Sequence, residues 1–159
     1  MSQVILGVDP GSRHTGFGVI QGERDKPRHL ESGRIHPGSR HSLENRLCQI
    51  YDGLTALIRQ HQPQALALEE IFLAANVRSA FVLGQVQGVV LLAAAQSSLP
   101  VFQYSATTVK KAVVGYGQAT KAQVQLMIEH LLGIKITNEH AADALAVGIC
   151  HLFHSSWMR

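Results

Sequence analysis

Three acidic residues stand in apolar surroundings, where an unpaired carboxylate is costly, and they are the first candidates for chemistry. Asp9 and Glu69 each end a short apolar run, and Asp143 lies within an alanine-rich segment. An ionised carboxylate is stable in such a place only when a cation or several hydrogen bonds offset its lost hydration. If the two runs are neighbouring strands and the alanine-rich segment is a helix over their ends, the three carboxylates converge.

Converging carboxylates are typical of a site for hard divalent cations such as Mg²⁺ or Mn²⁺. Two such ions, about 3.5 to 4 Å apart, can hold the attacking and leaving oxygens of a phosphoryl displacement. His140 lies one helical turn before Asp143, on the same face, and can add a nitrogen ligand. Glu139 faces almost the same way and competes for this role. The pattern predicts a metal-dependent nuclease.

Each acid also has a plainer interpretation. Asp9 precedes Pro10 and Gly11, a combination that is common in turns. Glu69 stands beside Glu70 and fits a solvated strand end, while Asp143 fits a salt bridge with a Lys or Arg. Taken together, with apolar strands leading to two of them, the three acids favour the metal cluster.

The elements that must position these acids follow from hydrophobic periodicity and capping signals. Apolar runs predict strands over residues 4–8, 15–20, 29–35, 65–69 and 101–104, with a polar turn over 22–27. Helices are predicted from Ser42 to just before Pro63, over 78–96, from the N-cap Ser105 to 114, from the Thr120 capping box to 132, and from 138 into 151–156. The first three strands form an antiparallel meander, and the strand–helix–strand order then adds crossover connections. We therefore expect an α/β fold with a five-stranded mixed sheet flanked by helices.

Composition bounds the class of protein. The 159 residues, 46% of them hydrophobic and 16% charged, suit one globular domain over 1–159 and exclude a disordered chain. The net charge of +3 permits a phosphate-rich partner. Two distant cysteines suggest neither a disulfide framework nor a zinc site, which fits a reduced cytoplasmic protein. The apolar runs are too short for a membrane span of roughly 20 residues, so no membrane partner is expected.

Basic, aromatic and small residues suggest partners. Lys110, Lys111 and Lys121 lie near helix starts and a glycine loop, where they can contact phosphates or remain ordinary solvated lysines. Phe72, three residues after Glu69, is either a ring that stacks on bases or a core residue. Ala80, Gly84 and Gly88 make the helix over 78–96 suitable for close packing, either on its own sheet or on a second copy of the chain.

Several motifs in order along the chain resemble one known family. They are Val4-Ile5-Leu6-Gly7-Val8-Asp9-Pro10-Gly11-Ser12-Arg13 with Thr15-Gly16, Leu68-Glu69 with Ile71-Phe72, Gly84-Gln85, Val113-Val114-Gly115 and Ala141-Ala142-Asp143-Ala144-Leu145-Ala146. Together they resemble the RuvC family of bacterial Holliday-junction resolvases. The resemblance implies a ribonuclease H-like fold and a homodimer that nicks two symmetric strands of a four-way DNA junction. It also implies ends that ligase can seal, a T-rich cleavage sequence, and work with the RuvA and RuvB branch-migration proteins.

The resemblance also assigns roles to residues. The acids matching Asp9, Glu69 and Asp143 bind Mg²⁺, two ions per subunit, and carry hydrolysis. The aromatic residue matching Phe72 helps to open the junction. The lysines that hold DNA in the family match Lys110 and Lys121.

One position departs from the best-known members, which carry Asp where this chain has His140. Imidazole in place of carboxylate removes a negative charge and favours nitrogen coordination, so Mn²⁺ should support activity as well as Mg²⁺ does. His140 and a cation-bound hydroxide are both candidates for the general base.

Three other functions compete with this hypothesis. The segment from Asp9 to Gly16 also resembles the phosphate loop of sugar kinases and actin-like proteins, although a second lobe and a GxxxxGK[ST] motif are missing. A module that binds junctions without cutting them is disfavoured, because acids facing phosphates repel them unless metal intervenes. A nuclease of the same fold that acts on structured RNA is the third.

Overall fold

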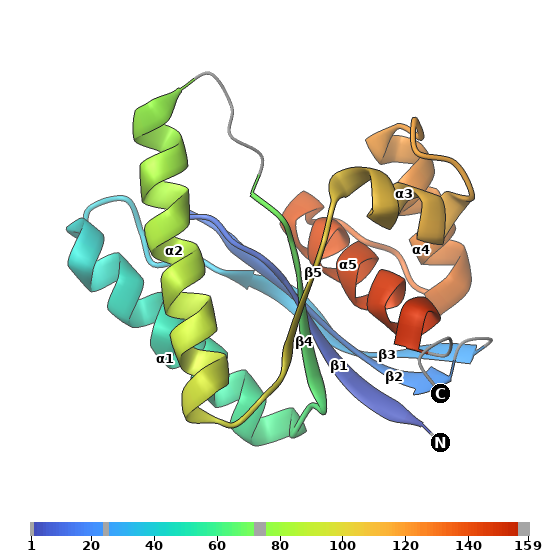
Figure 1. The fold of residues 1–159 in the computed structure, drawn as a ribbon, viewed down its shortest axis with the longest axis horizontal. Helices are drawn as coiled ribbons and strands as arrows, with labels where there is room; N and C mark the ends of the chain where they lie inside the picture. Colours follow the sequence, from blue (N-terminus) through green and yellow to red (C-terminus); the bar gives the residue numbers. More distant parts are fainter. Residues whose placement is uncertain (1, 24–25, 72–75, 156–159) are drawn as a thin grey trace.

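The structure is a computed structural model that describes residues 2–23, 26–71 and 76–155. Its strands are β1 (Gln3–Asp9), β2 (Thr15–Glu23), β3 (Lys26–Ile35), β4 (Ala65–Glu69) and β5 (Val101–Tyr104). Its helices are α1 (Leu43–His61), α2 (Val77–Gln96), α3 (Ala106–Val114), α4 (Lys121–Leu132) and α5 (Glu139–Ser155) (Figure 1). The predicted role of Phe72 lies outside the described residues.

The five strands form one mixed sheet in the order β3-β2-β1-β4-β5. β1 pairs antiparallel with β2, and β2 with β3, which confirms the predicted meander. β4 pairs parallel with both β1 and β5. The C-terminal ends of β1, β4 and β5 therefore meet at one edge of the sheet.

Helices cover both faces of this sheet. Figure 1 shows α1 and α2 on one face and α3, α4 and α5 on the other. Each face has its own hydrophobic core: Leu6, Leu66 and Leu68 point toward α1 and α2, whereas Ile5 and Ala67 point toward α5. All five side chains are buried, and the strict alternation along β1 and β4 decides which face each residue joins.

The helix boundaries confirm the predicted capping signals. Ser42, Ser105 and Thr120 each accept a hydrogen bond from a backbone N–H in the first turn of α1, α3 and α4. Thr120 and Gln123 form the full capping box, and Gly133 ends α4 in the left-handed region at φ 65°. These local interactions, which are visible in the sequence, place the helix ends within about a residue of the prediction.

The turn predicted over residues 22–27 is too long. β2 continues to Glu23 and β3 begins at Lys26, with Gly22 paired to Pro27 and Glu23 to Lys26. Polar residues and a proline in this segment suggested a loop, but backbone pairing at the end of a hairpin needs no apolar side chains. The extension lies at the opposite end of β2 from Thr15 and leaves the predicted site unaffected.

One helix differs from the others in its apolar character. Within the described part of the chain, α2 alone is long and apolar enough to cross a membrane by length and composition. Its buried residues, Val86, Val90, Ala93 and Ala94, pack against the core beside α1. The opposite face of α2 is exposed.

Candidate active site

Two of the three predicted acids are brought together by strand pairing. β1 and β4 run parallel with Val8 beside Leu68, so the next residues, Asp9 and Glu69, end adjacent strands at one edge. Because Val8 and Leu68 face α1 and α2, strand alternation turns both acids toward α5.

Glycines bring α5 close enough to add the remaining side chains. A Cβ at Gly7 would lie 2.0 Å from the carbonyl oxygen of Ala144, and a Cβ at Gly16 would lie 2.0 Å from that of His140. Gly16 is the register partner of Asp9 in the β1–β2 pair. The first turn of α5 therefore rests on the backbone beside Asp9, which places His140 next to it.

The pKa values of Asp9 and Glu69 are both raised. Burial raises the pKa of Asp9 to about 7, and the negative charges of Asp143 and Glu69 add to the effect. Burial and Asp143 likewise raise the pKa of Glu69. Each acid therefore lies within electrostatic reach of the others, in a site that favours added positive charge.

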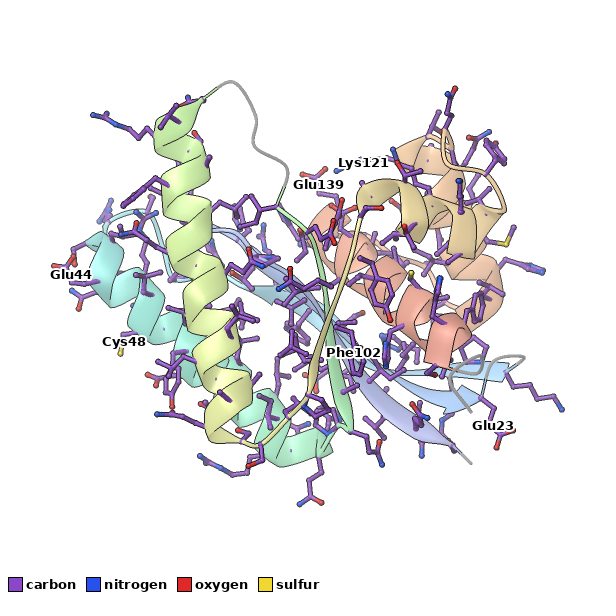
Figure 2. The ribbon with its side chains drawn as sticks, viewed as in Figure 1. Glu23, Glu44, Cys48, Phe102, Lys121 and Glu139 are labelled. Carbon is purple, nitrogen blue, oxygen red and sulfur yellow. The ribbon has the colours of Figure 1, made fainter. Side chains whose placement is uncertain are left out.

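Two of the predicted DNA-binding lysines face this acidic edge. Lys121 Nζ donates to Asp143 Oδ2 at 3.3 Å, and this carboxylate raises the pKa of the lysine. Lys110 lowers the pKa of Glu69. Figure 2 shows Lys121 close to Glu139, near the start of α5. The lysines therefore combine with the acids in one site, at the boundary between acidic edge and solvent.

His140 is better placed than Glu139 to join the acids. His140 Nδ1 lies 3.6 Å from Asp9 Oδ2, and its side chain is 28% exposed. The Glu139 side chain is 71% exposed, and its Oε1 lies 3.8 Å from His140 Nε2. Of the two candidates that the sequence left open, the geometry favours His140.

The donor set fits a divalent cation, although the side chains are not gathered around one point. Among the residues that the structure describes, no three His, Cys, Asp or Glu side chains are placed to hold an ion as they stand. Asp143 is turned to Lys121, and Asp9 to His140. Three carboxylates and an imidazole at one edge nevertheless form the oxygen-rich set that Mg²⁺ and Mn²⁺ prefer. Binding of such an ion through Asp143 would require this carboxylate to leave Lys121.

Two of the three acids, Glu69 and Asp143, line a cavity of about 520 Å³ between α3, α4 and α5. Lys110 and Lys121 line the same cavity, and Val109 and Val124 contribute apolar walls. The cavity therefore combines carboxylates for a cation with ammonium groups for a phosphate.

Sequence reasoning missed two further histidines beside the site. The ring of His14 stacks on His140 with centroids 4.9 Å apart, and His36 stacks on the other side of His14 at 4.4 Å. Partial burial and Arg34 lower the pKa of His14. The only signal in the sequence was the position of His14 just before β2, because the β1–β2 hairpin returns this residue to the edge that holds Asp9.

Comparison with known proteins then decides the family. The sequence model of the family "Crossover junction endodeoxyribonuclease RuvC" matches residues 5–151. The chain belongs to the RuvC family. A crossover junction endodeoxyribonuclease RuvC from Shewanella baltica is 51% identical over 154 residues, covering 96% of this chain and 88% of the relative. One from Geobacter sp. is 47% identical over 156 residues, covering 98% and 94%.

A solved RuvC structure confirms the architecture. The RuvC of Thermus thermophilus in complex with a Holliday junction substrate superposes with a TM-score of 0.94 at 32% identity, covering 98% of this chain and 96% of that one. The fold is thus the predicted ribonuclease H-like one, with a five-stranded mixed sheet between helices. As a RuvC-family member, the chain is a nuclease.

Proposed function

We propose that this RuvC-family endonuclease resolves four-way DNA junctions by hydrolysing phosphodiesters at the edge formed by Asp9, Glu69, Asp143 and His140. The observation that carries the proposal is the convergence of these side chains from β1, β4 and α5. The family match over residues 5–151 supports the same reaction. Hydrolysis in this family is metal-dependent, which agrees with an acidic edge that favours added positive charge.

Asp9, Glu69, Asp143 and His140 are the proposed holders of two Mg²⁺ ions. Such ions, when bound, neutralise charge on the phosphate and lower the pKa of water. The charges of both other acids act on Asp9, which suits a residue that serves both ions. His140 holds its ring nitrogen toward Asp9 and orients the attacking water, while Lys121, freed from Asp143, pairs with the phosphate.

Lys110 and Lys121 are the proposed phosphate contacts of the DNA. Both side chains act electrostatically on the acids that perform hydrolysis, so a phosphate held by them lies beside those acids. Binding of this kind is salt-sensitive and does not depend on base sequence. The T-rich cleavage preference and the role of Phe72 in opening the junction stay as expectations from the family resemblance.

The exposed face of α2 is the proposed homodimer contact. Val77, Phe81, Gly84, Gly88, Leu92 and Ala95 recur at spacings of three and four and so share one face of the helix. The side chains of Val77, Phe81 and Leu92 are 81%, 69% and 51% exposed. Among the described residues, no atom beyond the helix's own adjacent backbone lies within 4 Å of a Cβ placed at Gly84 or Gly88, so this face leaves room for close approach of a second helix. A second copy that covers it accounts for the apolar character of α2 without a membrane.

The remaining partners follow from the family. We propose that the dimer acts with RuvA and RuvB in the cytoplasm, and that its paired nicks leave 5′-phosphate and 3′-hydroxyl ends that ligase seals. Mn²⁺ supports cleavage at least as well as Mg²⁺ at matched concentration, because His140 offers nitrogen where a carboxylate would favour Mg²⁺. Clearly slower cleavage in Mn²⁺ counts against His140 as a ligand.

The decisive experiment incubates a labelled mobile four-way junction with the protein in EDTA, Mg²⁺ or Mn²⁺, beside Asp9→Asn. We expect symmetric, ligatable nicks that need both metal and Asp9. The Asp9→Asn variant should bind the junction as well as the unaltered protein or better, because it loses a charge that repels phosphate and little contact surface.

Each other outcome selects a rival. Normal cleavage by Asp9→Asn overturns the assignment of the site. Tight binding without nicks in any divalent metal indicates a junction-binding module. Preferential cleavage of structured RNA, or measurable ATP turnover, points to the other two hypotheses.

A further inference from the structure

Three histidine rings form a continuous stack that ends at the candidate active site. His36 and His14 lie with centroids 4.4 Å apart and planes 13° apart, and His14 and His140 lie 4.9 Å and 21° apart. The rings come from three places in the chain: the end of β3, the turn before β2 and the first turn of α5. In such a stack, each ring restricts the orientation of its neighbours.

Hydrogen bonds hold the first two rings from behind. An Arg34 guanidinium nitrogen lies 3.3 Å from His14 Nδ1, and because guanidinium only donates, His14 Nδ1 is the acceptor. His36 Nδ1 donates to the backbone carbonyl oxygen of Arg13 at 2.9 Å. Arg34 therefore holds the edge of the His14 ring through Nδ1, and His36 stacks on one face of this ring. The other face of the ring contacts His140.

His140 needs such a support, because its backbone alone does not fix its ring. The residue occupies the second position of α5, where Asn138 Oδ1 accepts its backbone N–H at 2.9 Å. Its Nδ1 lies 3.6 Å from Asp9 Oδ2, beyond ordinary hydrogen-bond distance, and its Nε2 lies 3.8 Å from the exposed Glu139 carboxylate. The stacking face of His14 is the closest ring contact that the structure gives to His140.

We propose that His14 is a positioning residue for hydrolysis, whose ring, held by Arg34 and His36, restricts His140 to the χ1 rotamer that places its imidazole beside Asp9. The proposal rests on the function assigned to His140 above. It explains how the imidazole of His140 keeps one orientation as a nitrogen ligand. An Asp at the same position would have no ring to orient. His14 acts through His140 and touches neither the cation nor the scissile phosphate.

The first test measures the orientation of His140 directly, in metal-free protein. Three-bond couplings from His140 Cγ to the backbone nitrogen and carbonyl carbon report its χ1 rotamer. We expect a single rotamer in the unaltered chain and in His14→Phe, which retains a flat ring, and rotamer averaging in His14→Ala. An unchanged single rotamer in His14→Ala, in protein that remains folded, overturns the proposal.

The second test measures single-turnover cleavage of a saturating labelled junction. His14→Ala should slow cleavage about three- to tenfold, the range that one aromatic pair supplies, while the junction Kd measured in EDTA stays the same. His14→Phe should restore most of the rate. His130→Ala, an exposed histidine on α4, is the matched control and should cleave normally.

A double-mutant cycle separates positioning from direct DNA contact. In a His140→Asp background, His14→Ala should cause no further loss, because no imidazole remains to be oriented. An equal loss in both backgrounds, or a weakened Kd, assigns His14 to DNA binding instead and overturns the proposal. If a background does not cleave, the rotamer measurement decides alone, and normal cleavage by Asp9→Asn refutes the proposed function without affecting that measurement.

Discussion

Asp9, a proposed ligand of the cation, also destabilises the fold. It is partly buried at the end of β1 and exposed to two like charges, so its pKa rises to about 7, from which we infer that its ionised form destabilises the fold in the absence of compensating positive charge. The positive charge of Lys121 offsets only part of this repulsion. Such a site lowers the stability of the metal-free protein and raises its affinity for a cation, a compromise that is common at functional sites.

Removal of the Asp9 charge should therefore stabilise the metal-free protein. We expect Asp9→Asn to raise the free energy of unfolding at pH 8 in EDTA by about 1 to 2 kcal/mol, measured by urea denaturation. Glu44→Gln is the control, since Glu44 lies in the first turn of α1, where backbone and Ser42 hydrogen bonds lower its pKa. Neutralising Glu44 should not stabilise the protein, and a stability of Asp9→Asn equal to or below that of the unaltered chain contradicts this account.

His151 gives the fold a separate dependence on pH. It is 3% exposed, its Nδ1 accepts a hydrogen bond from the Tyr104 hydroxyl at 2.7 Å, and burial lowers its pKa to about 4. The unfolded chain takes up this proton near pH 6.5 and the folded chain only near pH 4, so stability falls as the pH falls through this window. Between pH 7.5 and pH 5 the loss from His151 is about 1 to 2 kcal/mol.

The His151→Asn variant isolates this contribution. Asn places an acceptor near the Nδ1 position but does not titrate, so its unfolding free energy should fall less between pH 7.5 and pH 5 than that of the unaltered chain. Urea denaturation at both pH values, at one protein concentration, makes the comparison. An identical pH dependence of the two proteins would assign the acid sensitivity to other groups.

At the scale of elements, the distance between α5 and the sheet decides whether the site exists. Gly16 lies under the His140 carbonyl, and a Cβ there would meet it at 2.0 Å. We expect Gly16→Ala to displace the first turn of α5, to lower the free energy of unfolding by about 1 to 3 kcal/mol and to reduce junction cleavage more than junction binding.

Gly148→Ala provides the matched control on α5 itself. A Cβ at Gly148 would lie 3.7 Å from the nearest atoms of Gly7, which is ordinary van der Waals contact, and alanine favours a helix. This variant should be as stable as the unaltered chain or more stable, and it should cleave normally. Denaturation and cleavage assays on the pair check the prediction; equal effects of the two substitutions would show that α5 tolerates a shift over Gly16.

The sequence predicts much of this arrangement and misses a definable part. Apolar runs and caps such as Thr120 predict the elements, and parallel strands that end in Asp9 and Glu69 predict their convergence. The contact between Lys121 and Asp143, 22 residues apart, depends on how α4 packs beside α5. The stacking of His14 on His140 depends on how closely α5 packs against Gly7 of β1 and Gly16 of β2. Neither distance follows from local propensity, because both are set by packing among three or more elements.

For the whole molecule, α2 presents an apolar face that the described part of the chain leaves open. Its buried side carries Val86 and Val90, and its exposed side carries Phe81 and Leu92. Exposed apolar stripes with small residues are typical of interfaces, since glycines allow two helices to approach closely. Two active sites held in one dimer would explain how two symmetric strands are cut together.

Leu92→Glu tests this assembly. A carboxylate within the proposed contact would lose its hydration when a second copy covers it, so sedimentation velocity should show mainly single protomers where the unaltered chain forms dimers. On a cruciform plasmid, this variant should yield nicked circles, whereas paired cleavage by a dimer yields linear DNA. Leu126→Glu, which alters a 63% exposed leucine on α4, is the matched control and should retain both dimers and linear product. Dimers and linear product from Leu92→Glu would move the interface away from α2, whereas single protomers that still yield linear DNA would show that the two nicks need no dimer.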